Sequence, residues 1–244
     1  MSEWTLCSND SAPGSDSGSF FLQWERRNGC MYENVYKKMI AVTNRHLVPE
    51  NDVDGAIDAT ANTAVNAGAE WSEAYLKQLA YVASLHPRAM VLREKDLTGE
   101  KYEELAKAVI RLCEQAGTTL ILHRFPEVVQ HLGYDKLHLP LEMLKNMGRP
   151  EGLTLLGTSI HSVEDAKVAE QLGADYVFAG NIFETDCKKG LPGRGLEFLE
   201  NVCKAVNIPV YAIGGITEEK MPQILGTGAA GGCMMSGFMK LKNH

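Results

Sequence analysis

The sequence of 244 residues lacks features that mark several classes of protein. It has no cluster of lysine and arginine, and its net charge is −7, so we expect no nucleic-acid partner. It contains no run of about 18 apolar residues, so no membrane-spanning helix is expected. The N-terminal residues show no basic segment followed by an apolar one, so a secretory signal is not expected either.

Cysteine is sparse and irregularly spaced. The six cysteines form no Cys-x-x-Cys pair, which is the spacing typical of a structural zinc site. Scattered thiols of this kind are typical of reduced cytosolic proteins. We therefore expect a cytoplasmic protein with no metal site and no cofactor.

The sequence does contain a regular alternation of short apolar runs and helical patterns from residue 38 onwards. The runs predict strands at 39–43, 89–92, 119–122, 136–139, 154–158, 175–179, 209–213 and 232–235. Helices are expected at 54–85, 100–116, 126–132, 141–146, 162–172, 196–206, 218–225 and 240–244. Eight such rounds predict a parallel sheet closed into a single (β/α)₈ TIM barrel, a fold of about 250 residues.

The first 33 residues differ from the rest. Residues 8–19 are polar and rich in serine, glycine and aspartate, a composition that does not bury a core. We therefore predict a loose tail at 1–33 and one barrel domain at 34–244.

Two turns near the end of the sequence indicate a binding site. Gly214 and Gly215 follow the seventh predicted strand, and Ser236 and Gly237 follow the eighth. Glycine lets the backbone approach a ligand, and the helix that follows points free N–H groups at an anion. One such turn alone would indicate only a tight turn. The pair predicts a phosphate site, which barrels commonly build after their last two strands.

Six segments together resemble the thiamine phosphate synthase / TenI family of (β/α)₈ barrels. They are AVTN at 41–44, LREKD at 92–96, GTSIHS at 157–162, GADYVFAGNIFETDCKKG at 173–190, IPVYAIGGI at 208–216 and MMSGF at 234–238. Their order and spacing fit the family over roughly 38–240. The run FETDCKKGLPGRG is most similar to the TenI branch, whose members isomerise a thiazole phosphate carboxylate. The resemblance implies a phosphorylated thiazole as the ligand, and homo-oligomers are common in the family.

The resemblance also implies roles for loop residues. Lys188 and Thr185 match a lysine and a threonine of the loop after the sixth strand. Lys188 is expected to bind phosphate with the glycine turns, and Thr185 to contact the substrate. Arg93 and Lys95 remain at the end of the second strand, where Arg93 would bind substrate. Lys95 would hold an anionic group or act as a base.

Three departures from the family pattern disfavour the synthase reaction, which joins a thiazole phosphate to a pyrimidine diphosphate with Mg²⁺. The family's Asn-Asp-Arg run reads Leu122-His123-Arg124 here. Its Gly-Gln-x-Asp run reads Pro140-Leu141-Glu142-Met143, and Val91 replaces a glutamine. We therefore expect Mg²⁺ only if the synthase alternative holds.

The tautomerase branch places a histidine where this sequence has Asn181. Asparagine carries no proton at neutral pH, although it can orient a substrate. His123 and His161, at the ends of the third and fifth strands, are the expected proton carriers, with Lys95 as a third catalytic candidate. His138 lies inside a strand and is expected in the core.

The sequence thus predicts a thiazole tautomerase-like isomerase. Two alternatives stay open. One is thiamine phosphate synthase, a transferase that couples thiazole phosphate with hydroxymethylpyrimidine diphosphate. The other is a protein that binds thiazole phosphate without catalysis.

Overall fold

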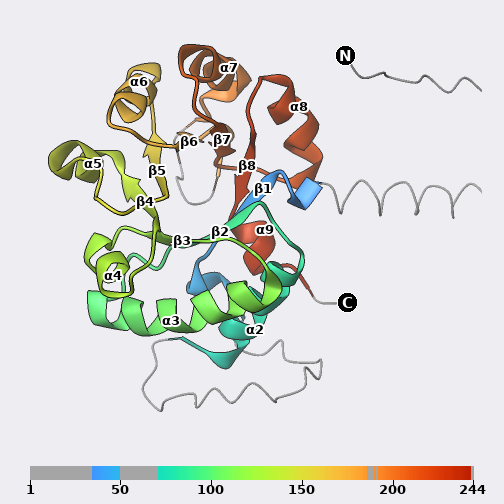
Figure 1. Cartoon of the computed structure of the whole chain (residues 1–244). Helices are drawn as coiled ribbons and strands as arrows, with labels where there is room; N and C mark the ends of the chain where they lie inside the picture. Colours follow the sequence, from blue (N-terminus) through green and yellow to red (C-terminus); the bar gives the residue numbers. More distant parts are fainter. Residues whose placement is uncertain (1–34, 50–70, 186–189, 191, 243–244) are drawn as a thin grey trace, which may run out of the picture. The chain divides into compact units, whose positions relative to one another are not determined.

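The computed structural model describes residues 35–49, 71–185, 190 and 192–242. Within them, eight parallel strands form a closed barrel in the order of the sequence, with β8 paired to β1 (Figure 1). The strands are β1 (Met39–Val42), β2 (Ala89–Leu92), β3 (Leu120–His123), β4 (Lys136–Pro140), β5 (Leu155–Ile160), β6 (Tyr176–Gly180), β7 (Val210–Ile213) and β8 (Gly231–Met234). The predicted (β/α)₈ barrel is therefore confirmed.

Helices surround the barrel and connect its strands (Figure 1). They are α2 (Glu73–Ser84), α3 (Gly99–Ala116), α4 (Pro126–His131), α5 (Leu141–Met147), α6 (Val163–Gln171), α7 (Gly195–Ala205), α8 (Met221–Gly226) and α9 (Ser236–Met239), with the 3₁₀ helices η1 (Arg45–Leu47) and η3 (Glu218–Lys220). None of these helices, within the described ranges, is both long and apolar enough to span a membrane.

The last predicted helix is wrong over the part that the structure describes. Residues 240–242 are not helical, and the final helix is α9, which begins directly after β8. The helix begins at Ser236, before the predicted position, because one helical turn there places Phe238 and Met239 in the core, with 0% and 1% exposure. The predicted tail at 1–33 lies outside the described residues, as do residues 54–70 of the predicted helix at 54–85.

The core has two layers because side chains alternate between the two faces of each strand. Outward-facing residues pack against the helices. Inward-facing residues fill the barrel, and they are Ile40, Val42, Ala89, Val91, Ile121, Tyr176, Phe178, Tyr211 and Cys233. β5 runs to Ile160, two residues beyond the predicted end, so Ser159 lies within the strand. The interior is therefore a packed core.

Candidate functional site

The carboxyl ends of the parallel strands share one face of the barrel, called the mouth below, where enzymes of this fold carry their active sites. Most predicted site residues lie there: Arg93 and Lys95 after β2, His123 at the end of β3, His161 after β5, Asn181 and Thr185 after β6, Gly214 and Gly215 after β7, and Ser236 and Gly237 after β8. Lys188 lies outside the described residues. The described candidates therefore share one face of the molecule, and their roles in binding and catalysis stay predictions.

Positive charge surrounds His123. Its backbone N–H donates to the Tyr102 hydroxyl at 2.8 Å, while its buried Nδ1 has no hydrogen-bond partner in the described part of the chain. Burial, aided by the charges of Arg93, Arg124 and Lys95, lowers the pKa of His123 to about 3. None of the ion pairs formed by described residues includes these three cations. This part of the mouth therefore suits an anion, and His123 is neutral near pH 7.

His138 lies in the barrel interior next to His123. It is 1% exposed, which confirms the predicted core position, and the two rings stack with centroids 5.7 Å apart. Its Nδ1 is 3.1 Å from the Tyr176 hydroxyl, and its Nε2 is 2.9 Å from the Ser159 hydroxyl. Burial lowers the pKa of His138 well below its usual value. A neutral imidazole is thereby bonded on both nitrogens, which fixes its ring.

His161 has an orientation that suits proton transfer. Its Nδ1 is 2.8 Å from the Gly180 carbonyl oxygen, which can only accept, so Nδ1 carries a proton. Its backbone N–H donates to Asp165, whose own N–H is capped by Ser162 at the start of α6. The ring is therefore held in place, and in the neutral form Nε2 remains as an acceptor.

The two glycines after β7 are required by packing. Gly214 and Gly215 have φ angles of 96° and 65°, which side-chain-bearing residues rarely adopt. A Cβ on Gly214 would lie 2.5 Å from the Asn181 Cβ, and one on Gly215 would lie 2.4 Å from the Glu184 carbonyl oxygen. The Phe183 N–H also donates to the Gly214 carbonyl at 3.0 Å. The loops after β6 and β7 thus form one unit, and phosphate binding by these glycines stays a prediction.

The remaining predicted ligands differ in exposure. Asn181 is buried, and its side-chain amide donates to the Phe183 carbonyl at 3.5 Å, so it contributes to the shape of the β6 loop. Ser236 and Gly237 are exposed at the start of α9. A Cβ on Gly237 would lie 2.2 Å from the Met234 sulfur, so a side chain at this position would require the Met234 side chain to move.

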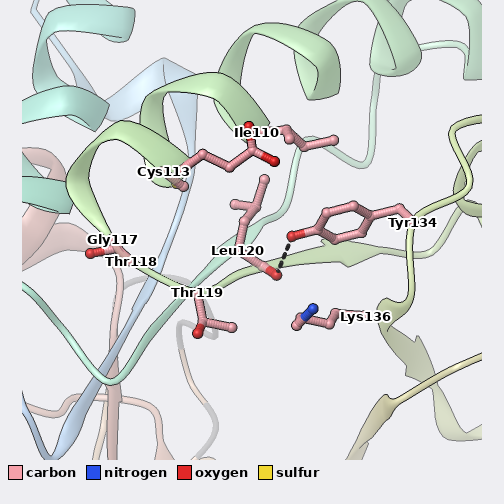
Figure 2. A pocket seen from close by; sticks show the side chains of 9 residues that line it. Ile110, Cys113, Gly117, Thr118, Thr119, Leu120, Tyr134 and Lys136 are labelled. Carbon is pink, nitrogen blue, oxygen red and sulfur yellow. Dashed lines mark hydrogen bonds between the residues drawn. The ribbon is translucent and has the colours of Figure 1, made fainter.

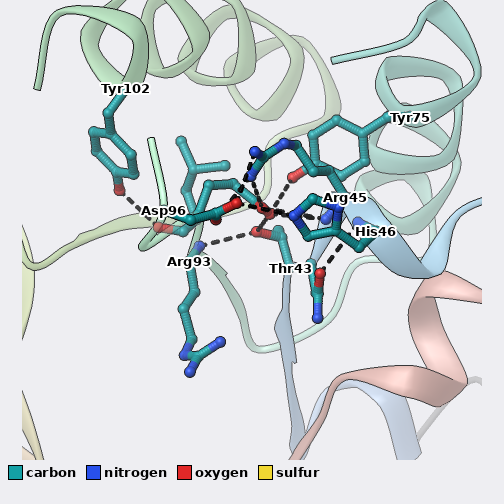
Figure 3. A network of polar contacts seen from close by, with 10 residues as sticks. Thr43, Arg45, His46, Tyr75, Arg93, Asp96 and Tyr102 are labelled. Atoms are coloured by element: carbon teal, nitrogen blue, oxygen red, sulfur yellow. Dashed lines mark hydrogen bonds and ion pairs between the residues drawn. The ribbon is translucent and has the colours of Figure 1, made fainter. Parts of the chain in front are cut away.

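Sequence analysis missed Glu94, which lies between Arg93 and Lys95. The Glu94 carboxylate is buried, and it accepts hydrogen bonds from Thr43 and Tyr75 (Figure 3). The signal that could have revealed it is the alternation of basic and acidic residues at 93–96, because alternate residues of an extended segment face opposite sides.

A pocket of about 250 Å³ lies away from the mouth (Figure 2). Its lining comes from the C-terminal part of α3 and from the starts of β3 and β4: Ile110, Cys113, Glu114, Gly117, Thr118, Thr119, Leu120, Tyr134 and Lys136. These residues lie at the amino ends of the strands, opposite the mouth. None of the predicted site residues lines the pocket, so we place the candidate site at the mouth.

The described residues offer no ready-made cluster of metal ligands. They contain no group of three or more histidine, cysteine, aspartate or glutamate residues that could hold a metal. Glu142 is exposed and pairs with Lys145 at 2.8 Å, while Asp96 pairs with Arg45. Mg²⁺ prefers carboxylate, phosphate and water oxygens, whereas arginine and lysine surround His123.

Comparisons with known proteins agree with the fold. Residues 62–238 match the family described as thiamine monophosphate synthase (TMP-TENI). A thiamine-phosphate synthase of Caldivirga maquilingensis is 35% identical over 158 residues, which cover 64% of this chain and 77% of that protein. A putative thiamine-phosphate synthase 2 of Aquifex aeolicus is 34% identical over 173 residues, covering 70% and 93%.

The structure of the thiamine phosphate pyrophosphorylase from Pyrococcus furiosus superposes with a TM-score of 0.65 at 25% identity, covering 85% of this chain and 90% of that one. The match of the family covers more than half of the present sequence. The chain therefore belongs to the thiamine monophosphate synthase (TMP-TENI) family.

Proposed function

We propose that this protein is an enzyme of thiamine biosynthesis that uses a thiazole phosphate bound at the mouth of the barrel. The match of the family over residues 62–238 carries the proposal. The surroundings of His123 support it, because three cations without ion pairs among the described residues suit a phosphorylated substrate.

The names of the relatives favour the coupling of thiazole phosphate with a pyrimidine diphosphate over the isomerisation that the sequence placed first. In the coupling reaction the diphosphate leaves with its negative charge. Positive groups placed where charge develops stabilise such a transition state. Arg93, Lys95 and Arg124 are the groups that the described residues offer for this role. No step is assigned to Mg²⁺, because the described residues offer no cluster of three or more ligands for it.

Isomerisation of a thiazole phosphate is the second candidate, and the geometry of His161 favours it. The Gly180 carbonyl keeps the proton on Nδ1, which leaves Nε2 to take a proton from one position of the substrate and return it at another. Lys95 would hold a substrate carboxylate. His123, with a pKa of about 3, would act as a hydrogen-bond partner. In this assignment His161 takes the role of the histidine that the tautomerase branch has at position 181, so Asn181 does not have to carry a proton.

One set of assays separates the candidates. Purified protein is incubated with thiazole phosphate and hydroxymethylpyrimidine diphosphate, with Mg²⁺ or with EDTA, and thiamine phosphate is measured. In parallel, thiazole phosphate carboxylate is followed by NMR for isomerisation. Thiamine phosphate formation identifies the synthase, and isomerisation identifies the tautomerase-like enzyme. Binding of both thiazoles is measured by the shift that they cause in the melting temperature. Binding without either reaction identifies a non-catalytic binder. The absence of a shift with either thiazole refutes the thiazole assignment.

A further inference from the structure

Among the described residues, Glu94 is the one carboxylate that is buried, with a side-chain exposure of 1%. Its Oε1 accepts hydrogen bonds from the Thr43 hydroxyl at 2.7 Å and from the Tyr75 hydroxyl at 2.8 Å. Burial, followed by the charge of Glu94, raises the pKa of Tyr75 well above its usual value, so this hydroxyl remains a donor. A buried carboxylate thus joins the end of β1 to α2.

Arg45 completes the network on its outer side (Figure 3). Its backbone N–H lies 3.2 Å from each Glu94 oxygen, and its Nη1 lies 3.2 Å from Oε2. The same guanidinium binds both oxygens of Asp96, at 2.9 and 2.8 Å. Bidentate pairs of this kind restrict both partners to one geometry. Arg45 therefore ties together the two acidic residues that alternate with Arg93 and Lys95.

The network reaches the backbone of the basic residues directly. The Thr43 hydroxyl, which donates to Glu94, accepts the Arg93 backbone N–H at 2.9 Å. In Figure 3 the side chain of Arg93 extends away from the cluster around Thr43. Arg93 and Lys95 follow the end of β2, which pairs with β3 up to Leu122, and His123 is the last residue of β3. The charges of both residues also contribute to lowering the pKa of His123. One carboxylate therefore fixes the segment from which both cations reach the mouth.

We propose that Glu94 is a positioning residue, which holds Arg93 and Lys95 in the geometry that binds the anionic group of the substrate. Four of its contacts come from outside its own segment, and together they fix both ends of its carboxylate. A segment held in this way loses little conformational freedom when its cationic side chains bind a phosphate or diphosphate. The inference rests on the anion site of the proposed function, but not on which of the two reactions takes place.

The test measures the affinity for inorganic pyrophosphate and for thiazole phosphate by isothermal titration calorimetry in EDTA. Every variant is first shown to be folded at the working temperature by circular dichroism. Arg93→Ala and Lys95→Ala define the effect of losing each cation. Glu94→Gln removes the negative charge at position 94, and Glu94→Asp keeps it. Thr43→Val keeps the carboxylate but removes the hydroxyl that donates to Glu94 and accepts the Arg93 backbone N–H.

Asp175 provides a matched control at the opposite end of the barrel. It accepts from Arg149 at 3.0 Å and from the Leu156 N–H at 2.6 Å, so it also joins a guanidinium to the backbone. Asp175→Asn should lower the melting temperature and leave the affinity unchanged. This variant separates a general loss of stability from a loss of positioning.

Loss of one charge-assisted contact weakens binding by about tenfold to a hundredfold. We expect Glu94→Gln to weaken pyrophosphate binding by this amount, Thr43→Val by about tenfold, and Glu94→Asp by less than Glu94→Gln. Wild-type affinity in folded Glu94→Gln, or in Thr43→Val if the first variant does not fold, would overturn the inference. So would a wild-type protein that binds pyrophosphate without dependence on Arg93, or not at all. Pyrophosphate binding that depends on Arg93 and Glu94, without thiazole phosphate binding, would refute the proposed substrate and leave the positioning role standing.

Discussion

Acid should destabilise this protein through its buried histidines, and His123 allows the effect to be calculated. Its pKa is about 3 in the folded protein, against an ordinary value of 6.5. Between these two values the unfolded chain binds a proton that the folded chain does not, so stability falls as the pH falls. Between pH 7.5 and pH 5.0 the loss from His123 is about 2 kcal/mol. It is small above pH 7, because the histidine is then neutral in both states.

The assay is urea unfolding at pH 7.5 and at pH 5.0, with the wild type and with His123→Gln. Glutamine does not titrate, so the variant should lose about 2 kcal/mol less than the wild type between the two pH values. His138, whose pKa is also lowered by burial, is present in both proteins and contributes to both. An equal loss in the two proteins would refute the burial of a neutral His123.

Three further predictions follow from the same face of the barrel. Gly214→Ala should reduce the free energy of unfolding by about 2–4 kcal/mol, because its φ of 96° and the nearby Asn181 both exclude a Cβ. Gly226→Ala, where no atom lies within 4 Å of the added Cβ, is the control and should not destabilise, as unfolding in urea would show. His161→Gln should lower kcat for isomerisation by about a hundredfold or more while the melting temperature stays near that of the wild type; an unchanged kcat would remove His161 from the reaction. EDTA should leave pyrophosphate binding unchanged in calorimetry, and dependence on Mg²⁺ would show that residues outside the described set complete a metal site.

Much of the fold could be predicted because the strands of a barrel are buried on both faces. Each therefore gives a short, continuous apolar run, and the eight predicted runs overlap the eight observed strands. The last helix was misplaced because Ser236 and Gly237 were interpreted as a turn after the eighth strand, and only packing shows that 236–239 form a helical turn that buries Phe238 and Met239. The local sequence pattern therefore predicted the strands more accurately than the short helices.

The site was predicted less completely. Histidines and basic residues at strand ends are visible in a sequence, since the fold places all strand ends on one face. Glu94 was missed because a charged residue beside Arg93 and Lys95 resembles solvated surface, and its burial depends on Thr43 and Tyr75 from other elements. For Gly214 the sequence indicated a ligand, whereas the structure provides a packing reason as well. The burial of Glu94 and the packing around Gly214 both depend on contacts between segments that are far apart in the sequence.

The close packing of the loops after β6 and β7 limits how the sequence of this barrel can be altered. Phe183 and the turn at Gly214 and Gly215 are joined by backbone hydrogen bonding, and Lys220 adds a bond to the Gly215 carbonyl at 2.6 Å while lying 4.4 Å from the centre of the Phe183 ring. A side chain at Gly214 or Gly215 would collide with residues 181–184 of the loop after β6. Natural variation at 181–184 is therefore expected to track variation at 214–215. A variant designed to take the substrate specificity of a relative should therefore carry both loops of that relative.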